Sequence, residues 1–141
     1  MKTIKKRRKE NKTDYKKRLK LLKSQKPRII FRKTNKYLIS QYITSKEAKD
    51  KVEIGMTSKK LLEFGWPKDL KGSLKSLPAA YFLGYLIGKN ILKEKKEIPI
   101  VDFGMIRSIK KSKIYSFLKG VVDVGVKIKH NENVFPSEEI I

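Results

Sequence analysis

The most abundant chemically functional side chains in this sequence are lysines and arginines, and they are concentrated in residues 1–26, here called the N-terminal arm. Thirteen of these residues are basic and only Glu10 and Asp14 are acidic, so the arm carries +11, half of the +22 of the whole chain. Such a segment has too little apolar surface to collapse on itself, and its like charges repel. A phosphate backbone suits these cations, because each contact releases condensed counterions without reading the base sequence.

Side chains for acid–base or metal-assisted catalysis are scarce by comparison. His130 is the sole histidine and the chain has no cysteine, which excludes a thiolate nucleophile or thiolate metal site. Asp102 and Asp123 supply fewer carboxylates than the roughly three or four that a two-metal nuclease needs. We expect Asp102 to accept hydrogen bonds from a nearby loop. The sequence therefore predicts a protein that is not an enzyme, with no catalytic residue, metal ligand, cofactor or small-molecule substrate.

Two further basic clusters lie in the body of the chain. Residues 28–36 place four cations around Asn35, with Tyr37 among them, and cations with interleaved aromatic rings suit phosphates, ribose hydroxyls and unstacked bases. Residues 107–113 form the second cluster, for which a plain solvated loop is nearly as good an interpretation. The residues predicted to contact RNA are Lys5, Lys6, Arg7, Arg8, Lys12, Tyr15, Lys16, Arg18, Arg28, Arg32, Lys33, Asn35, Lys36, Arg107, Lys110, Lys111 and Lys113.

Two different structures are expected within the arm. Residues 1–12 contain almost no apolar side chain and are predicted to be disordered in isolation. Beyond them, a helix with a narrow apolar stripe is predicted to end near residue 23 and to pack lightly on the body. Thr13 is its expected cap, and Asp14 suits the positive end of the helix dipole. The stripe consists of Tyr15, Leu19 and Leu22.

The body, residues 27–130, shows the pattern of one α/β domain. Strands are predicted at 28–33, 37–43 and 52–56, with a polar loop at 44–51, and a short helix at 58–64 is followed by a loop. A central helix begins at Pro78 and runs to about residue 91, and a buried strand follows at 98–103. Ser112 is the expected cap of a last helix that Gly125 ends. The order β-β-β-α-β-α implies a mixed sheet with packed helices, and Gly84 and Gly88 are expected to let the central helix approach the sheet closely.

The remaining composition argues against a membrane and against secretion. The longest apolar run, residues 79–88, is about half of the roughly 20 residues that a membrane span requires. The chain has no cysteine, so nothing in its sequence indicates an oxidising compartment. We therefore expect an intracellular, cytoplasmic protein. Residues 131–141 hold three glutamates and no lysine or arginine, and are predicted to form an acidic tail.

Short motifs along nearly the whole chain, taken together, resemble one family: the archaeal and eukaryotic-type ribosomal protein eighteen of the large subunit. Its opening motifs are matched by Thr13-Asp14-Tyr15, Arg18-Leu19, Lys26-Pro27-Arg28, Arg32-Lys33-Thr34-Asn35-Lys36 and Gln41. Its later motifs are matched by Phe64-Gly65-Trp66, Pro78-Ala79-Ala80-Tyr81, Gly84, Gly88, Asp102-Phe103-Gly104, Leu118-Lys119-Gly120, Asp123, Gly125, His130 and Phe135-Pro136.

The resemblance implies a structural protein that binds 5S ribosomal RNA and helps attach it to the large ribosomal RNA in the central protuberance. It also implies a ribonuclease-H-like topology without the nuclease carboxylates, and ribosomal protein five of the large subunit as a neighbour. The loop at 107–113 departs from the usual Arg-Pro-Thr-Lys-Gly-Ser-Arg, and lysine does not reproduce the bidentate fork of arginine. From charge alone, a general nucleic-acid-binding basic protein is the alternative.

Overall fold

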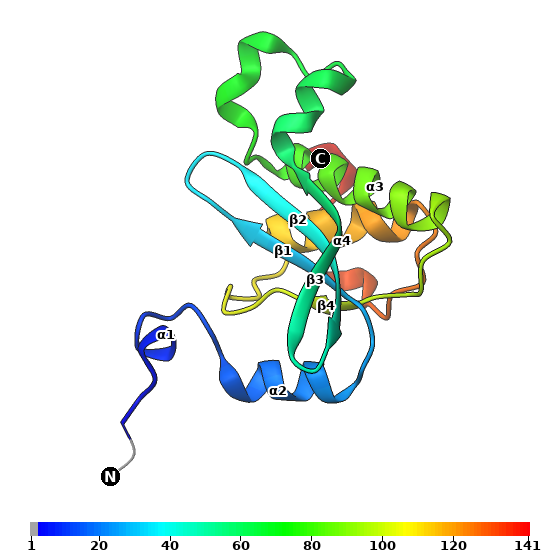
Figure 1. Ribbon diagram of the computed structural model, residues 1–141. Coiled ribbons are helices and arrows are strands. Elements are labelled where there is room, and N and C mark those ends of the chain that lie inside the picture. Colours follow the sequence, from blue (N-terminus) through cyan, green and yellow to red (C-terminus); the bar gives the residue numbers. More distant parts are fainter. Residues whose placement is uncertain (1–2) are drawn as a thin grey trace.

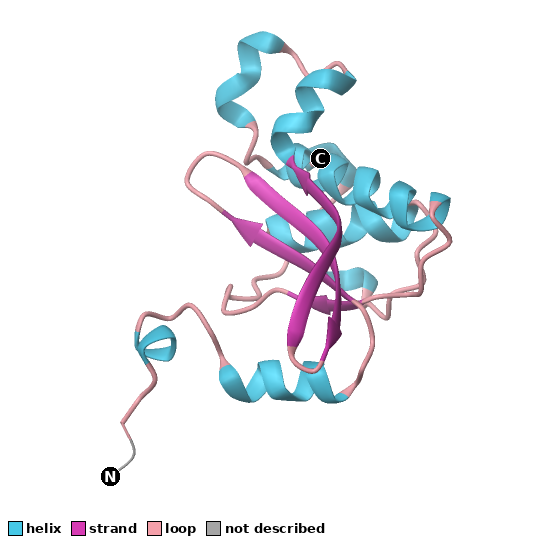
Figure 2. Cartoon of the chain, viewed as in Figure 1, coloured by secondary structure: helices cyan, strands magenta, loops and turns pink. Residues whose placement is uncertain are grey.

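A four-stranded mixed sheet forms the centre of the computed structural model, which describes residues 3–141 (Figures 1 and 2). The strands are β1 (Arg28–Lys33), β2 (Leu38–Lys46), β3 (Lys49–Thr57) and β4 (Ile100–Asp102), in the spatial order β3-β2-β1-β4. Strand β2 pairs antiparallel with both β1 and β3, whereas β4 runs parallel to β1. The predicted mixed α/β class is confirmed, although β4 is shorter than the strand expected at 98–103.

The connection between β2 and β3 corrects one expectation from the sequence. Residues 44–51 were expected to be a polar loop, but the two strands continue through most of them and leave only a tight turn. Glu47 and Ala48 form this turn with φ values of 50° and 63°. Two consecutive left-handed residues fit the twist of a two-residue hairpin turn. As a result, Ser45 and Asp50 are opposed on neighbouring strands, where they contribute to the site described below.

Two helices, α3 (Leu77–Lys93) and α4 (Lys113–Asp123), cover one face of the sheet (Figure 1). The core lies between them and the strands, and the rings of Phe31 on β1 and Phe117 on α4 are 4.8 Å apart between centroids. The start of α3 is as predicted, with Pro78 in the first turn, and the Ser76 side chain caps the helix by accepting from the N–H of Ala79 at 3.3 Å.

The glycines of α3 serve a different contact from the one expected. A Cβ added to Gly84 would lie 2.1 Å from the carbonyl oxygen of Phe117, and one added to Gly120 would lie 2.1 Å from that of Tyr81. Each glycine therefore faces the backbone of the other helix. The expectation of a close approach to the sheet is wrong, because the close approach joins α3 to α4.

Shorter helical segments complete the fold. The arm contains α1 (Lys6–Lys9) and α2 (Tyr15–Lys23). The 3-10 helix Ser58–Phe64 ends at Gly65, which has a φ of 95°, as expected, whereas a second 3-10 helix, Lys68–Ser73, replaces the loop predicted there. Among residues 3–141, no helix has both the length and the apolar character needed to cross a membrane.

The last eleven residues contact the body. They contain the 3-10 helices Glu132–Val134 and Glu138–Ile140, and the carbonyl of Val134 accepts a hydrogen bond from the N–H of Lys111 at 2.9 Å. Lys119 on α4 lies 3.4 Å from Glu138.

Candidate nucleic-acid interface

Helix α2 is placed by a cap that the sequence interpretation assigned to the wrong residue. The Asp14 side chain accepts hydrogen bonds from the N–H groups of Lys16 at 3.1 Å and Lys17 at 3.2 Å. Thr13, the expected cap, instead accepts a hydrogen bond from the Nε of Arg7 at 3.0 Å. A carboxylate can cap the helix and also oppose its positive N-terminal dipole, which explains why Asp14 takes this position.

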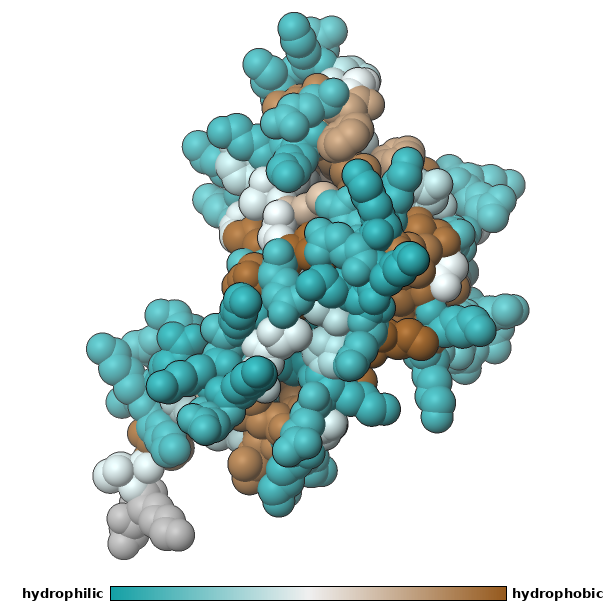
Figure 3. Space-filling model, turned by 45° about the vertical axis from the view of Figure 1, so that its right-hand side comes forward, coloured by the Kyte–Doolittle hydropathy of each residue, from teal (hydrophilic) through white to brown (hydrophobic). Residues whose placement is uncertain are grey.

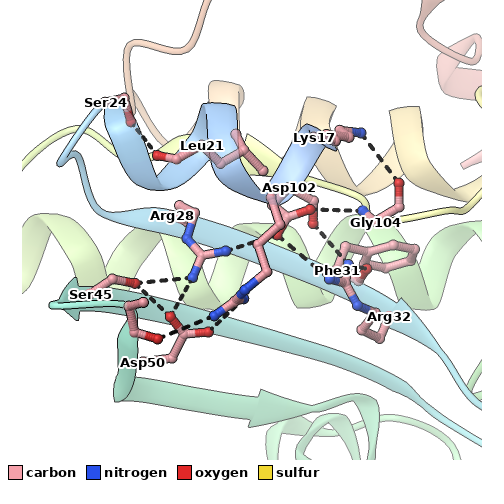
Figure 4. A network of polar contacts seen from close by, with 12 residues as sticks. Lys17, Leu21, Ser24, Arg28, Phe31, Arg32, Ser45, Asp50, Asp102 and Gly104 are labelled. Carbon is pink, nitrogen blue, oxygen red and sulfur yellow. Dashed lines mark hydrogen bonds and ion pairs between the residues drawn. The ribbon is translucent and has the colours of Figure 1, made fainter. Parts of the chain in front are cut away.

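Polar contacts attach α2 to the body. The Nζ of Lys17 donates to the carbonyl of Gly104 at 3.3 Å (Figure 4). The guanidinium of Arg18 donates to Asp50 at 3.0 Å. A hollow lies between α2 and the sheet, and Leu21 is one of the residues that line it. Of the predicted stripe, Leu19 is 55% exposed, whereas Tyr15 and Leu22 are half-buried, and no residue of α2 is fully buried. The apolar contribution of α2 is therefore small, in line with the light packing that was predicted.

Arg28 is buried beneath this helix, which corrects its predicted place in an exposed basic cluster. It is only 1% exposed, and its two terminal nitrogens donate to Asp102 at 3.2 Å, to Asp50 at 2.8 Å and to Ser45 at 3.1 Å (Figure 4). A buried guanidinium needs such partners, because an unpaired charge in the interior is strongly destabilising. Arg28 thus holds β1, β2, β3 and β4 together, and its guanidinium is enclosed by protein.

Asp102 accepts hydrogen bonds from a nearby loop, as predicted. Its Oδ1 accepts from the N–H of Gly104 at 2.8 Å, while its Oδ2 faces Arg28. Arg32 lies on the same face of the sheet, donates to the carbonyl of Asp102 at 2.9 Å, and keeps 39% of its side chain exposed. Burial lowers the pKa of Arg32, Asp102 opposes that shift, and the charge of Arg28 adds to it. Arg32 therefore lies partly in the protein and partly at the surface.

Asp50 links the arm to this buried network. It contacts Arg18 from α2 and Arg28 from β1, and it accepts from the hydroxyl of Ser45 at 2.7 Å. Burial would raise the pKa of Asp50, but the hydrogen bonds from Ser45 and Arg18 and the charge of Arg28 hold it below its ordinary value of 3.8. The charged form of Asp50 is thus the form that the fold stabilises.

The cations of α2 that face away from the sheet have no such partners. Lys16, Lys20 and Lys23 recur at i, i+4 and i+7, so they follow one face of the helix, and all three are exposed. Within residues 3–141 none of the three forms an ion pair. We call these three residues the α2 lysine row. Lys20 and Lys23 were absent from the predicted contacts, although the helical spacing was sufficient to find them.

The rest of the arm contains several contacts of its own. The Nζ of Lys5 lies 4.5 Å from the centroid of the Tyr15 ring, Lys12 pairs with Glu10 at 2.9 Å, and Lys6 is exposed on α1. Arg8 lies 3.7 Å from Asp14 and donates to the sulfur of Met105 at 3.4 Å. These exposed contacts are individually weak, so the cations remain available to an external anion.

Lys33 from the first body cluster and three cations of the second cluster, Arg107, Lys111 and Lys113, line one hollow. A pocket of about 410 Å³ lies between the end of β1 and the start of α4. We call it the lysine-lined pocket; it is lined by Phe31, Lys33, Leu77, Ile106, Arg107, Ile109, Lys111, Ser112, Lys113 and Ile114. Lys36 and Lys110 are exposed on the neighbouring loops but do not line it.

Lys75, which the sequence interpretation missed, adds a further cation beside this pocket. Its Nζ donates to the carbonyl of Asn35 at 2.9 Å, so it lies at the tip of the β1–β2 hairpin. Burial lowers the pKa of Lys113, and the charges of Lys33 and Lys75 lower it further. Lys75 is far from both clusters in the sequence, so its position beside this pocket could not be predicted from local patterns.

The surface of the molecule is largely hydrophilic. The face in Figure 3 is covered mainly by hydrophilic side chains, with smaller hydrophobic patches between them. Within residues 3–141, no group of three or more histidine, cysteine, aspartate or glutamate side chains could hold a metal ion. The arrangement suits the binding of an extended anion by many cations, each of which contributes a modest amount.

Fold and surface together define a strongly basic, mixed α/β protein with a row of outward cations that form no ion pair in the part of the chain that the structure describes. Comparison with known proteins identifies the family. A family model described as "Ribosomal large subunit proteins 60S L5, and 50S L18" matches residues 1–99. The chain is 44% identical over 135 residues to the large ribosomal subunit protein uL18 of Korarchaeum cryptofilum, and 43% identical over 136 residues to that of Methanosphaera stadtmanae. The match to uL18 of Methanospirillum hungatei is 38% over 133 residues.

These alignments cover most of the chain: 96%, 96% and 94% of its residues, and 67%, 68% and 74% of the three relatives. The chain belongs to the uL18 family of large-subunit ribosomal proteins. It is accordingly a structural component of the cytoplasmic ribosome, and its family is not a family of enzymes, as the sequence interpretation predicted.

Proposed function

We propose that this protein binds 5S ribosomal RNA and helps attach it to the large ribosomal RNA in the central protuberance, beside ribosomal protein five. The observation that supports this most is the α2 lysine row, three outward cations without a carboxylate partner on a helix held against the body. Helical spacing sets these charges at regular intervals, which suits successive phosphates of one RNA strand.

The lysine-lined pocket supports a second area of contact on the body. The pocket and the α2 lysine row belong to different elements, one at the end of β1 and one in the arm. An RNA that contacts both would run along the outward face of α2 and reach the body at the hairpin tip. We therefore interpret the arm and the body as two separate contact surfaces for one RNA, and the body contributes the exposed part of Arg32 and the hairpin tip.

Binding of purified 5S RNA at several salt concentrations tests the role of the arm. The variant Lys16→Gln/Lys20→Gln/Lys23→Gln should bind more weakly, with a salt slope that is flatter by about 0.7 to 0.9 log units for each phosphate that the variant no longer neutralises. The matched control Lys59→Gln/Lys60→Gln/Lys71→Gln removes the same charge from exposed positions elsewhere. Equal slopes for the two triple variants would contradict the proposal.

The absence of cysteine allows a direct test of location. A cysteine introduced as Lys20→Cys and labelled with an iron chelate should direct hydroxyl-radical cleavage of 5S RNA in reconstituted large subunits. Lys89→Cys, exposed on α3, is the matched control. Cleavage confined to other RNA from position 20 would argue against the proposed placement.

The alternative function is that of a general nucleic-acid-binding protein, and only the positive charge of the chain supports it. A competition experiment separates the two functions, because a duplex DNA with the same number of phosphates offers the same charge. We expect 5S RNA to compete far better than the DNA. Equal competition would favour the alternative.

A further inference from the structure

The lysine-lined pocket has features that a plain backbone contact does not require. Its lining includes the apolar side chains of Phe31, Ile106 and Ile109, here called the floor, together with the cations Lys33 and Lys113, here called the rim. A volume of about 410 Å³ falls within the roughly 300–1,000 Å³ that single small ligands occupy. A stacked duplex presents phosphates, sugars and base edges but keeps the flat faces of its bases inside the stack, so no base face would cover the apolar floor.

The rim is arranged for an anion. Within residues 3–141, Lys33, Lys75 and Lys113 form no ion pair with a carboxylate. Lys113 is close enough to the other two lysines for their positive charges to lower its pKa. Protonated lysines that repel one another gain when a phosphate lies between them. The hollow therefore combines a site for one negative charge with a site for an apolar group.

The start of α4 contributes polar groups to the same place. Ser112 occupies the cap position, but its hydroxyl makes no cap hydrogen bond and is buried without a partner. The N–H of Tyr115 already donates to the carbonyl of Ser112 at 3.0 Å, and the N-terminal end of a helix carries partial positive charge. An oxygen of a bound phosphate or ribose would accept from the Ser112 hydroxyl and lie near this positive end, since Ser112 lines the pocket.

We propose that the lysine-lined pocket binds one unstacked nucleotide from a single-stranded segment of RNA. Its phosphate contacts Lys33, Lys75 and Lys113, and its base or ribose lies over the apolar floor. This inference rests on the proposed function, since it assumes an RNA partner, but it adds a distinct ligand: an extruded nucleotide rather than a regular backbone. Proteins commonly recognise RNA through such unstacked bases in loops and bulges.

Photo-cross-linking of the full chain to a short single-stranded RNA that carries 4-thiouridine tests this inference. We expect cross-links in the peptide that contains Ile106 and Ile109. Lys33→Gln/Lys113→Gln should weaken binding of the single strand by about tenfold. Ile109→Ser should weaken it by about threefold, and should leave binding of a blunt-ended RNA duplex, which has no loop, unchanged. Lys89→Gln is the control for a lysine outside the pocket.

Three outcomes would overturn the inference. Cross-links confined to the arm would place the single strand elsewhere. Equal affinity of Ile109→Ser and the unaltered protein for the single strand would show that the floor makes no contact. Inorganic phosphate that displaces the strand completely, with no added affinity from the nucleoside, would reduce the pocket to a phosphate site.

Failure of the nucleotide site is distinguishable from failure of the proposed function. If pocket variants behave like the unaltered protein while the α2 lysine-row variant binds 5S RNA more weakly, the nucleotide site is wrong and 5S RNA binding stands. If the single strand cross-links to the pocket but 5S RNA and duplex DNA compete equally, the reverse holds.

Discussion

Arg28 and Asp102 are joined across two parallel strands: the Nη1 of Arg28 on β1 lies 3.2 Å from the Oδ2 of Asp102 on β4, and both side chains are buried. Arg28→Met should lower the free energy of unfolding by about 3–5 kcal/mol, because Asp102 would keep a buried charge without its partner. Urea denaturation measures the decrease. The double variant Arg28→Met/Asp102→Leu should recover part of it, and a single variant that unfolds like the unaltered protein would contradict this account.

Gly84 and Gly120 should tolerate no side chain. Alanine at either position places a methyl group against a carbonyl oxygen of the other helix, so we expect each substitution to cost about 1–3 kcal/mol or more in the free energy of unfolding. Gly72→Ala is the matched control, since no atom lies within 4 Å of its added Cβ. Thermal unfolding distinguishes them, and equal melting temperatures for Gly84→Ala and Gly72→Ala would be inconsistent with the close α3–α4 crossing.

Asp50 should make stability depend on acidity. The pKa of Asp50 is lower in the folded protein than its ordinary value of 3.8, so its contribution is fully present above that value. As the pH falls below 3.8 and through the folded pKa, the unfolded state takes up the proton first and the contribution disappears. Denaturation at several pH values measures this decline. Asp50→Asn should show a shallower decline, and identical curves would refute the assignment.

Arg18 should control the attachment of the arm rather than the stability of the body. Its ion pair with Asp50 is partly exposed, and such pairs contribute about 0–1 kcal/mol. In Arg18→Gln, the amides of α2 should exchange with deuterium faster while those of α3 remain protected. Lys20→Gln is the control on the same helix. Unchanged exchange in α2 would mean that other contacts hold it.

Periodicity and turn chemistry were enough to predict most elements of this fold. The strand pair around residues 34–36, the 3-10 helix that ends at Gly65, and both core helices follow from local patterns. The pattern failed where the outcome depended on a distant partner. Gly84 and Gly88 looked suited to close packing, but no local signal shows that the partner is α4 and not the sheet.

Arg28 illustrates the same difficulty at the site. Alternation along β1 places Arg28 and Arg32 on one face, but the sequence does not reveal that α2 lies over only part of that face. One arginine is therefore buried and the other is partly exposed, although both lie on the same strand. Lys75 was missed for a related reason, since only folding brings it to the hairpin tip.

The docking of α2 through Asp50 and the Gly104 loop separates the cations of this protein into two groups: arginines that are paired inside the fold and lysines that face outward. The chain has few acidic side chains, and two of them, Asp50 and Asp102, are concentrated beneath one helix as internal counterions for Arg18, Arg28 and Arg32. Within the described residues, 3–141, no carboxylate pairs with the α2 lysine row on the outside. A polyanion that approaches this helix therefore meets cations that have no intramolecular competitor, while those that maintain the architecture are already neutralised from within.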